Sequence, residues 1–137
     1  QNEISEQFTY ARLLTKEDYL ISWNESACNI HRRVMALYPN TFTFWKHKRI
    51  KILKTIPLIA SFYDIMDDKE RSISANSSFS TLAPGKITYV DPNIGIVVST
   101  GDGNLLIKEA QLEGNIAKKS DVLVQQLKPI LSDTFGD

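Results

Sequence analysis

The last third of the chain limits the possible folds most, because three short strand-like segments follow one another there. Residues 86–90, 94–100 and 105–111 are rich in the β-branched and apolar side chains that fit a pleated sheet. The connections at 91–93 and 101–104 have the Asp, Asn, Pro and Gly content of tight turns. The sequence therefore predicts a mostly β fold.

A further hairpin is predicted between residues 41 and 53. Side chains alternate over 41–45 and again over 49–53, which is the two-residue period of a strand, and 46–48 make the turn. Phe42 and Phe44 share one side of the first strand. In the second strand, the predicted inward residues are Ile50 and Ile52, and the predicted outward residues are Arg49 and Lys51.

Two helices are predicted to flank the strands. The first covers 23–37, with Ser22 as its cap and Glu25 completing a capping box. The second covers 120–127. Residues 56–84 are first highly charged and then rich in Ser and Asn, so we expect a flexible insertion there with one helical turn.

Short strands, tight turns and a helix at each end are typical of a small Greek-key β-barrel of the OB-like type. At 137 residues the chain has the length of one domain. We expect 15–137 to form this OB-like barrel and the polar start of the chain to be a linker.

Charge is unevenly distributed along the chain. The whole chain carries 16 basic and 16 acidic residues, yet 26–63 contains seven Lys or Arg and neither Asp nor Glu. Such a stretch is either a chance accumulation of surface cations or a nucleic-acid interface. Trp45 and Tyr38 lie among the cations, as stacking side chains do in single-strand binders. The predicted RNA-binding residues are Arg32, Arg33, Lys46, Lys48, Arg49, Lys51, Lys118 and Lys119.

Three other groupings have a simpler structural interpretation. Cys28 and His31 share a helix face, but a metal site needs three or four ligands, so we expect a buried Cys28. The glycines at 101–103 precede a strand, which favours a hairpin over a phosphate loop. The acidic residues at 64–68 lack the spacing of a calcium loop. We predict neither catalytic residues nor a metal site.

The composition also bears on the compartment. A single cysteine, no apolar run of about 20 residues and a polar start favour a reducing compartment without membrane contact. We expect a cytoplasmic monomer.

Four segments together resemble the C-terminal domain of methionyl-tRNA formyltransferases. They are Thr9-Tyr10-Ala11-Arg12-Leu13, then Ile21-Ser22-Trp23 with the helix from Ala27 to Pro39, then Pro84-Gly85-Lys86-Ile87, and finally Val97 to Gly103 with Leu105, Gln111 and Gly114. Their common spacing carries the resemblance, which implies that 1–14 are a linker or strap from a preceding catalytic domain.

The resemblance implies an enzyme that transfers a formyl group from 10-formyltetrahydrofolate to the amino group of methionyl initiator tRNA in translation initiation. The catalytic residues would belong to a Rossmann-like N-terminal domain, and this chain would bind tRNA and no cofactor of its own. Two alternatives stay open. One is the equivalent domain of a sugar-nucleotide or folate-handling formyltransferase without RNA binding, and the other is a protein-binding module with an apolar patch at Trp45 and Phe44.

Overall fold

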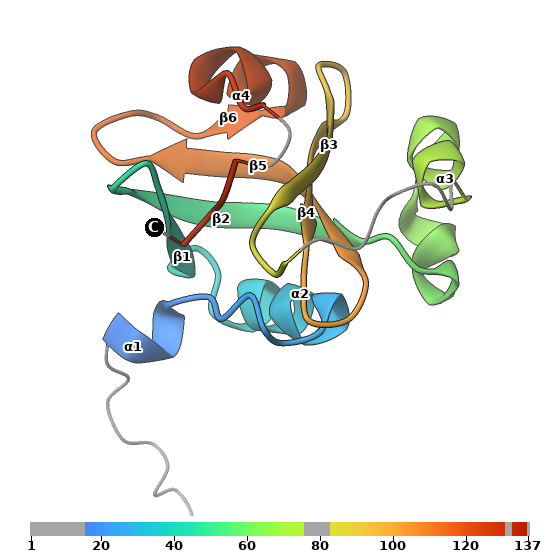
Figure 1. The fold of residues 1–137 in the computed structure, drawn as a ribbon, viewed down its shortest axis with the longest axis horizontal. Helices are drawn as coiled ribbons and strands as arrows, with labels where there is room; N and C mark the ends of the chain where they lie inside the picture. Colours follow the sequence, from blue (N-terminus) through green and yellow to red (C-terminus); the bar gives the residue numbers. More distant parts are fainter. Residues whose placement is uncertain (1–15, 76–82, 131–132, 137) are drawn as a thin grey trace, which may run out of the picture.

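Six strands form one antiparallel sheet in the computed structural model, which describes residues 16–75, 83–130 and 133–136 (Figure 1). The strands are β1 (Phe42–Trp45), β2 (Lys48–Pro57), β3 (Ile87–Asp91), β4 (Gly95–Ser99), β5 (Asn104–Leu112) and β6 (Lys118–Lys119). Their order is β1-β2-β5-β4-β3, and β6 pairs with β5 outside this path. The mostly β prediction is confirmed, whereas the short strand β6 was not predicted.

Helices flank the sheet, as predicted. They are α1 (Lys16–Tyr19), α2 (Ala27–Ala36), the 3-10 helix η2 (Ala60–Ile65), α3 (Asp68–Ala75) and α4 (Ser120–Leu127). In Figure 1, α2 lies below the sheet and α4 above it. Apolar side chains of both helices meet the same core, which includes Ile30 of α2, Leu123 of α4 and the fully buried Ile50 and Ile52 of β2. The inward orientation predicted for Ile50 and Ile52 is therefore confirmed.

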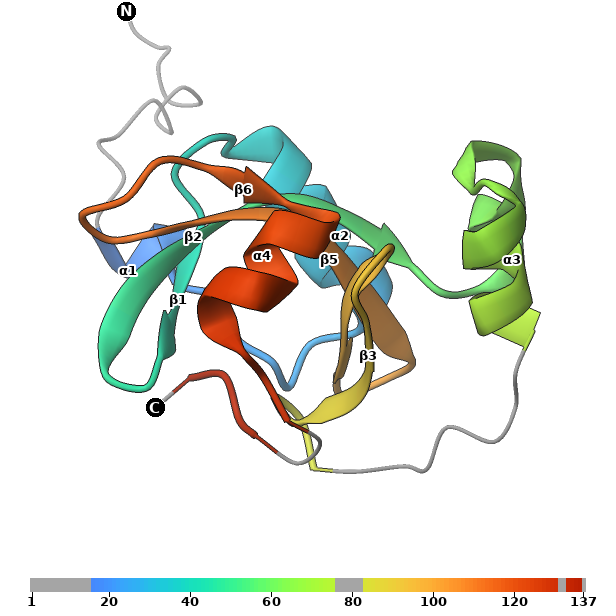
Figure 2. The same cartoon turned by 90° about the horizontal axis from the view of Figure 1, so that it is seen from above.

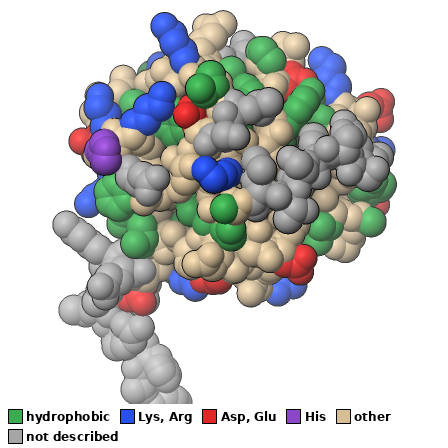
Figure 3. Space-filling model, in the orientation of Figure 1, with side chains coloured by type: hydrophobic (Ala, Val, Ile, Leu, Met, Phe, Trp, Pro, Cys, Tyr) green, Lys and Arg blue, Asp and Glu red, His purple; other side chains and the backbone are tan. Residues whose placement is uncertain are grey.

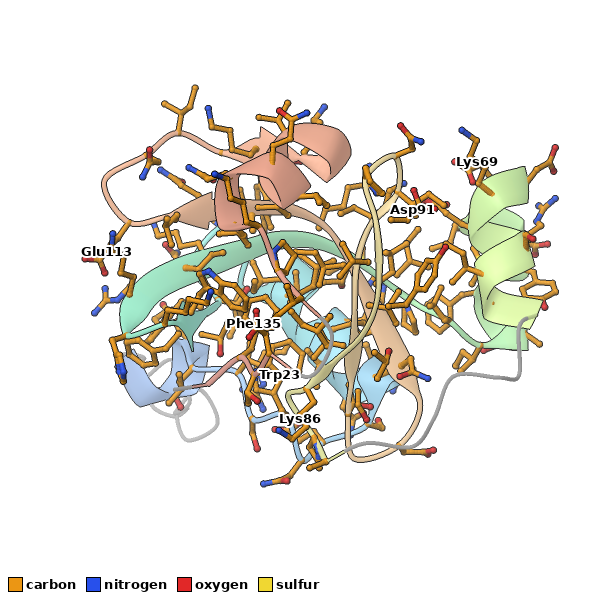
Figure 4. All side chains as sticks on the ribbon, turned by 45° about the horizontal axis from the view of Figure 1, so that its top comes forward. Trp23, Lys69, Lys86, Asp91, Glu113 and Phe135 are labelled. Atoms are coloured by element: carbon orange, nitrogen blue, oxygen red, sulfur yellow. The ribbon has the colours of Figure 1, made fainter. Side chains whose placement is uncertain are left out.

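The predicted fold class, a mostly β OB-like domain with flanking helices, is confirmed, and its sheet is not closed. Within the described residues, the edge strands β1 and β3 have no ladder with each other, because the C-terminal segment 133–136 lies between them. The Gly136 amide donates to the Phe44 carbonyl at 2.8 Å, and the Ile87 amide donates to the Asp133 carbonyl at 2.8 Å. Figure 4 shows Phe135 of this segment beside Trp23, with their ring centroids 5.8 Å apart.

The helix predicted over 23–37 is α2, and it begins later than predicted. Its cap is Ser26, whose side chain accepts the Asn29 amide at 3.1 Å, so the cap predicted at Ser22 is wrong. The later start is caused by a contact with a distant part of the chain. The carbonyls of Trp23 and Glu25 accept the Gly101 amide at 2.9 and 3.0 Å, and this contact holds the preceding residues in a loop.

The segment after β2 forms a second, smaller core. The sequence predicted one helical turn over 56–84, but β2 continues to Pro57, and η2 and α3 follow it. Buried Met66 and Ile73 from this segment pack with Val97 and Leu106, which lie on the sheet face opposite the main core. Figure 2 shows α3 standing to one side of the sheet. The predicted strap at 1–14 lies outside the described residues.

Candidate functional site

The hairpin of β1 and β2 collects cations and aromatic rings on its outer face. Paired residues in a ladder share a face, and Phe42 pairs with Lys51 while Phe44 pairs with Arg49. Lys51 also pairs with Gln111 on β5. We call this surface the outer hairpin face, and it consists of Phe42, Phe44, Arg49, Lys51, Gln111 and Glu113.

Aromatic packing fixes the position of Arg49. Its guanidinium carbon lies 4.7 Å from the centroid of the Phe42 ring, which is a cation–π distance. Phe44 meets Phe42 edge to face with centroids 5.8 Å apart. Phe42 is buried, so it supports the arginine instead of offering a free ring to a ligand. The guanidinium is thereby presented at the surface with less freedom than a lysine would have.

A hollow of about 240 Å³ lies on the outer hairpin face between β2 and the end of β5. It is lined by Arg49, Lys51, Gln111, Glu113 and Gly114. The Arg49 amide donates to a Glu113 carboxylate oxygen at 2.7 Å, and the Glu113 amide donates to the Arg49 carbonyl at 2.9 Å. Glu113 thus fixes where β5 leaves the sheet, and two cations against one carboxylate leave the hollow positive.

The other predicted lysines belong to the hairpin turn, the start of β2 and the short strand β6. Lys46 and His47 have positive φ angles of 49° and 71°, and Lys46 lies 3.9 Å from an Asp133 carboxylate oxygen. Lys48 is exposed at the start of β2. Lys119 pairs with Glu109, and Lys118 pairs with Ala110. Figure 3 shows basic side chains gathered at the left of the view, over the end of the molecule that carries the hairpin turn and the β5–β6 connection.

The two arginines of α2 lie apart from the outer hairpin face. Arg32 and Arg33 line a shallow depression beside α2 that shares no residue with the hollow at Arg49 and Lys51. Arg33 is already engaged, because its guanidinium lies 3.5 Å from a Glu25 carboxylate oxygen and donates to the Asp18 carbonyl at 3.2 Å. Arg32 is exposed. The predicted cations therefore fall on two separate surfaces.

Trp45 was predicted as a stacking side chain, and that prediction is wrong. Its side chain is 4% exposed and packs on Phe135 with ring centroids 4.9 Å apart. The reason is register, since Trp45 pairs with Lys48 and faces the core together with Thr43. This burial also removes the apolar patch imagined at Trp45 and Phe44. Tyr38, by contrast, is exposed.

Cys28 and His31 do not form a shared site. His31 Nδ1 lies 2.9 Å from Thr55 Oγ1, and burial lowers the pKa of His31 while the nearby Arg32 charge acts in the same direction. Cys28 is half-buried instead of fully buried as predicted. Among the residues that the structure describes, no three His, Cys, Asp or Glu side chains come together as metal ligands do.

Sequence reasoning missed three members of the outer hairpin face, namely Phe42 as the support of Arg49, Gln111 and Glu113. The alternation over 41–45 placed Phe42 and Phe44 on one side, but only the register of β1 on β2 shows that this is the side of Arg49. Glu113 and Gln111 come from the other end of the chain, and no local pattern connects them with the hairpin.

In the described part of the chain, no helix is long and apolar enough to cross a membrane.

Comparison with known proteins matches this chain to one family. The profile of the family described as "Formyl transferase, C-terminal domain" matches residues 13–127. The methionyl-tRNA formyltransferase of Prochlorococcus marinus (strain MIT 9303) is 40% identical over 136 residues, which cover 99% of this chain and 40% of the relative. The protein of the same name from Synechococcus sp. (strain WH7803) is 41% identical over 131 residues, which cover 96% of this chain and 38% of the relative. The chain thus spans about two fifths of the length of these relatives.

Proposed function

The chain belongs to the formyl transferase C-terminal domain family, and from this premise we propose that it is the tRNA-binding C-terminal domain of a methionyl-tRNA formyltransferase. The observation that carries the proposal is its 40% identity, over 99% of its length, to proteins of that name. The proposed enzyme transfers a formyl group from 10-formyltetrahydrofolate to the amino group of methionyl initiator tRNA. Residues outside this chain would perform the transfer, and this domain would hold the tRNA.

Contacts to the RNA backbone suit the outer hairpin face better than base recognition does. Arg49 and Lys51 are two residues apart on one strand, which is about 7 Å at the usual rise of a strand. That spacing is close to the distance between successive phosphates of a strand of nucleic acid. Because Phe42 and Trp45 are buried, this face offers no ring of theirs for stacking. Phosphate contacts position a nucleic acid and carry little sequence information.

We assign different roles to the other predicted cations. Lys46, Lys48, Lys118 and Lys119 would extend the positive surface around the outer hairpin face. Arg32 would make a separate contact with the RNA beside α2. Arg33 would mainly hold Glu25 and the Asp18 carbonyl within the domain. We also propose that the protein works in the cytoplasm as a monomer, together with its own N-terminal catalytic domain.

Salt-dependent tRNA binding tests the proposal. Binding of tRNA to the chain is measured by fluorescence anisotropy between 50 and 200 mM salt, roughly the range over which phosphate contacts lose most affinity. We expect Arg49→Gln and Lys51→Gln each to weaken binding by about three- to tenfold and to reduce the slope of log K against log salt by about one.

Lys69→Gln is the matched control. Lys69 is an exposed cation on α3, and Figure 4 shows it at the end of the molecule opposite Glu113. Binding that does not depend on salt, or an equal loss in Lys69→Gln, would contradict the proposal. The shared name of the relatives favours tRNA over a sugar nucleotide as the acceptor. Formylation assays of the full-length protein with both acceptors compare the two directly.

A further inference from the structure

An apolar groove of about 520 Å³ lies between α2, β2 and η2. Its buried lining comes from Val34 of α2 and from Leu53 and Ile56 of β2. Its rim is formed by Met35, Tyr38 and Ile65, whose side chains are 66%, 60% and 57% exposed. It shares no residue with the hollow on the outer hairpin face.

The three rim side chains gather unusually large apolar surface at one place. Single exposed hydrophobic residues are normal on soluble domains, but a contiguous patch around a groove marks a contact surface. The other large hydrophobic residues that the described chain exposes are Leu20, Ile116, Val122 and Ile130, and none of them lines this groove. The groove therefore stands out as the apolar contact surface of the domain.

Charge restricts what fits the groove. Two lysines line it and no carboxylate does. The Lys108 ammonium forms an ion pair with the buried carboxylate of Glu70, so Lys54 is the exposed cation that the groove presents. Glu109, the cross-strand neighbour of Lys54, does not line the groove. His31 is buried in the lining, and burial lowers its pKa, which favours its neutral form. The groove thus combines an apolar slot with one positive end.

We propose that this groove is the docking site for a segment of the enzyme's own polypeptide from outside the present chain, which inserts an apolar side chain between Met35, Tyr38 and Ile65 and places a carboxylate against Lys54. The inference rests on the proposed function, because it requires the longer enzyme. The relatives have about three fifths of their length outside the matched region, so an intramolecular occupant is available. A tethered segment acts at millimolar effective concentration and binds through a small contact.

A second copy of the chain fits the groove less well. In a two-fold symmetric contact the same patch meets itself, so each copy would bring Lys54 to the contact and no carboxylate from the groove lining to pair with it. That arrangement places like charges at the edge of an apolar contact. An acidic, apolar segment of the same polypeptide avoids this repulsion.

Site-specific photocrosslinking of the full-length enzyme tests the proposal. p-Benzoylphenylalanine replaces the exposed Met35, the protein is irradiated, and crosslinked peptides are identified by mass spectrometry. We expect intramolecular crosslinks to a segment outside the present chain that has Asp or Glu beside an apolar residue. The same photoprobe in place of Ile116, which is 71% exposed on the β5–β6 connection, should not yield that peptide. Crosslinks confined to this chain, to a second copy or to tRNA would overturn the proposal.

A charge reversal tests the positive end of the groove. Lys54→Glu should reduce the crosslinking yield from position 35 by about fivefold, the upper range for an exposed ion pair. Lys69→Glu, which reverses a lysine away from the groove, should leave the yield unchanged. Equal yields in both variants would overturn the assignment of a carboxylate. These results are separable from the proposed function, because tRNA binding and formylation by the same enzyme are measured independently.

Discussion

At the scale of single residues, Gly101 shows how closely the β4–β5 turn approaches the loop before α2. Its amide donates to the carbonyls of Trp23 and Glu25, and the neighbouring Asp102 carbonyl accepts the Ala27 amide at 3.0 Å. A Cβ added to Gly101 would overlap the Asn24 carbonyl oxygen. The sequence predicted a turn here from its glycines. It did not predict the contact, because the partner residues lie far away in the chain.

We expect Gly101→Ala to lower the free energy of unfolding by about 3 kcal/mol, since backbone must move to admit the methyl group. Urea denaturation of the chain measures the change. Gly114→Ala is the comparison, because a Cβ at Gly114 meets nothing within 4 Å and only its φ of 81° opposes the substitution. That strain costs about 1 kcal/mol. Equal losses in the two variants would show that the contact with Asn24 is unimportant.

At the scale of elements, the sequence predicted the hairpins well and the helix boundaries less well. The two-residue period identified the sides of β2 correctly because one face must meet the core. The start of α2 was wrong because the capping signal at Ser22 competes with a tertiary contact that no local pattern contains. Helix α3 was underestimated because its polar sequence, Asp68–Ala75, buries the single large apolar residue Ile73 and the charged Glu70.

Two serine substitutions distinguish the predicted cap of α2 from the observed one. Ser26→Ala removes the side-chain oxygen that accepts the Asn29 amide, so we expect a loss of about 1 kcal/mol in unfolding free energy. Ser22→Ala should change it by less than about 0.5 kcal/mol, because Ser22 is exposed and precedes the helix. Thermal unfolding of both variants gives the comparison. A larger loss of unfolding free energy in Ser22→Ala than in Ser26→Ala would support the helix start predicted from the sequence.

At the scale of the whole molecule, the sequence predicted a β domain with a basic surface but not how that surface is divided. The run of basic residues over 26–63 was recognised in the sequence. How these residues divide between α2 and the outer hairpin face depends on the packing of α2 against the sheet. The opening of the sheet between β1 and β3 also depends on a tertiary contact. The segment 133–136 has no strand pattern of its own, and it takes its place between β1 and β3 through backbone hydrogen bonds.

The ion pair of Lys108 and Glu70 connects the second core to the sheet, and breaking it should loosen α3. Glu70 is 2% exposed, and its carboxylate also accepts the Asp67 amide at 3.0 Å. We expect Lys108→Ala to destabilise the protein by about 2 kcal/mol, because it leaves a buried carboxylate without its cation.

A double-mutant cycle in urea checks this expectation. Adding Glu70→Gln to Lys108→Ala should recover about half of the loss, because a neutral amide needs no counter-charge. Lys69→Ala should be close to neutral, since Lys69 is an exposed neighbour on the same helix. If the changes in unfolding free energy caused by Lys108→Ala and by Glu70→Gln simply add in the double variant, the ion pair contributes no coupling energy.

The central position of β5 next to β2 also sets the order in which the chain matures on the ribosome. Ile50 and Ile52 pair with Leu112 and Ala110, so the hairpin of β1 and β2 has no sheet neighbour on that side until β5 has been synthesised. At roughly 5–20 residues per second, this interval lasts several seconds. During it, the pairing edge of β2 is open, and the lysines and the arginine along β2 oppose edge-to-edge pairing with another chain.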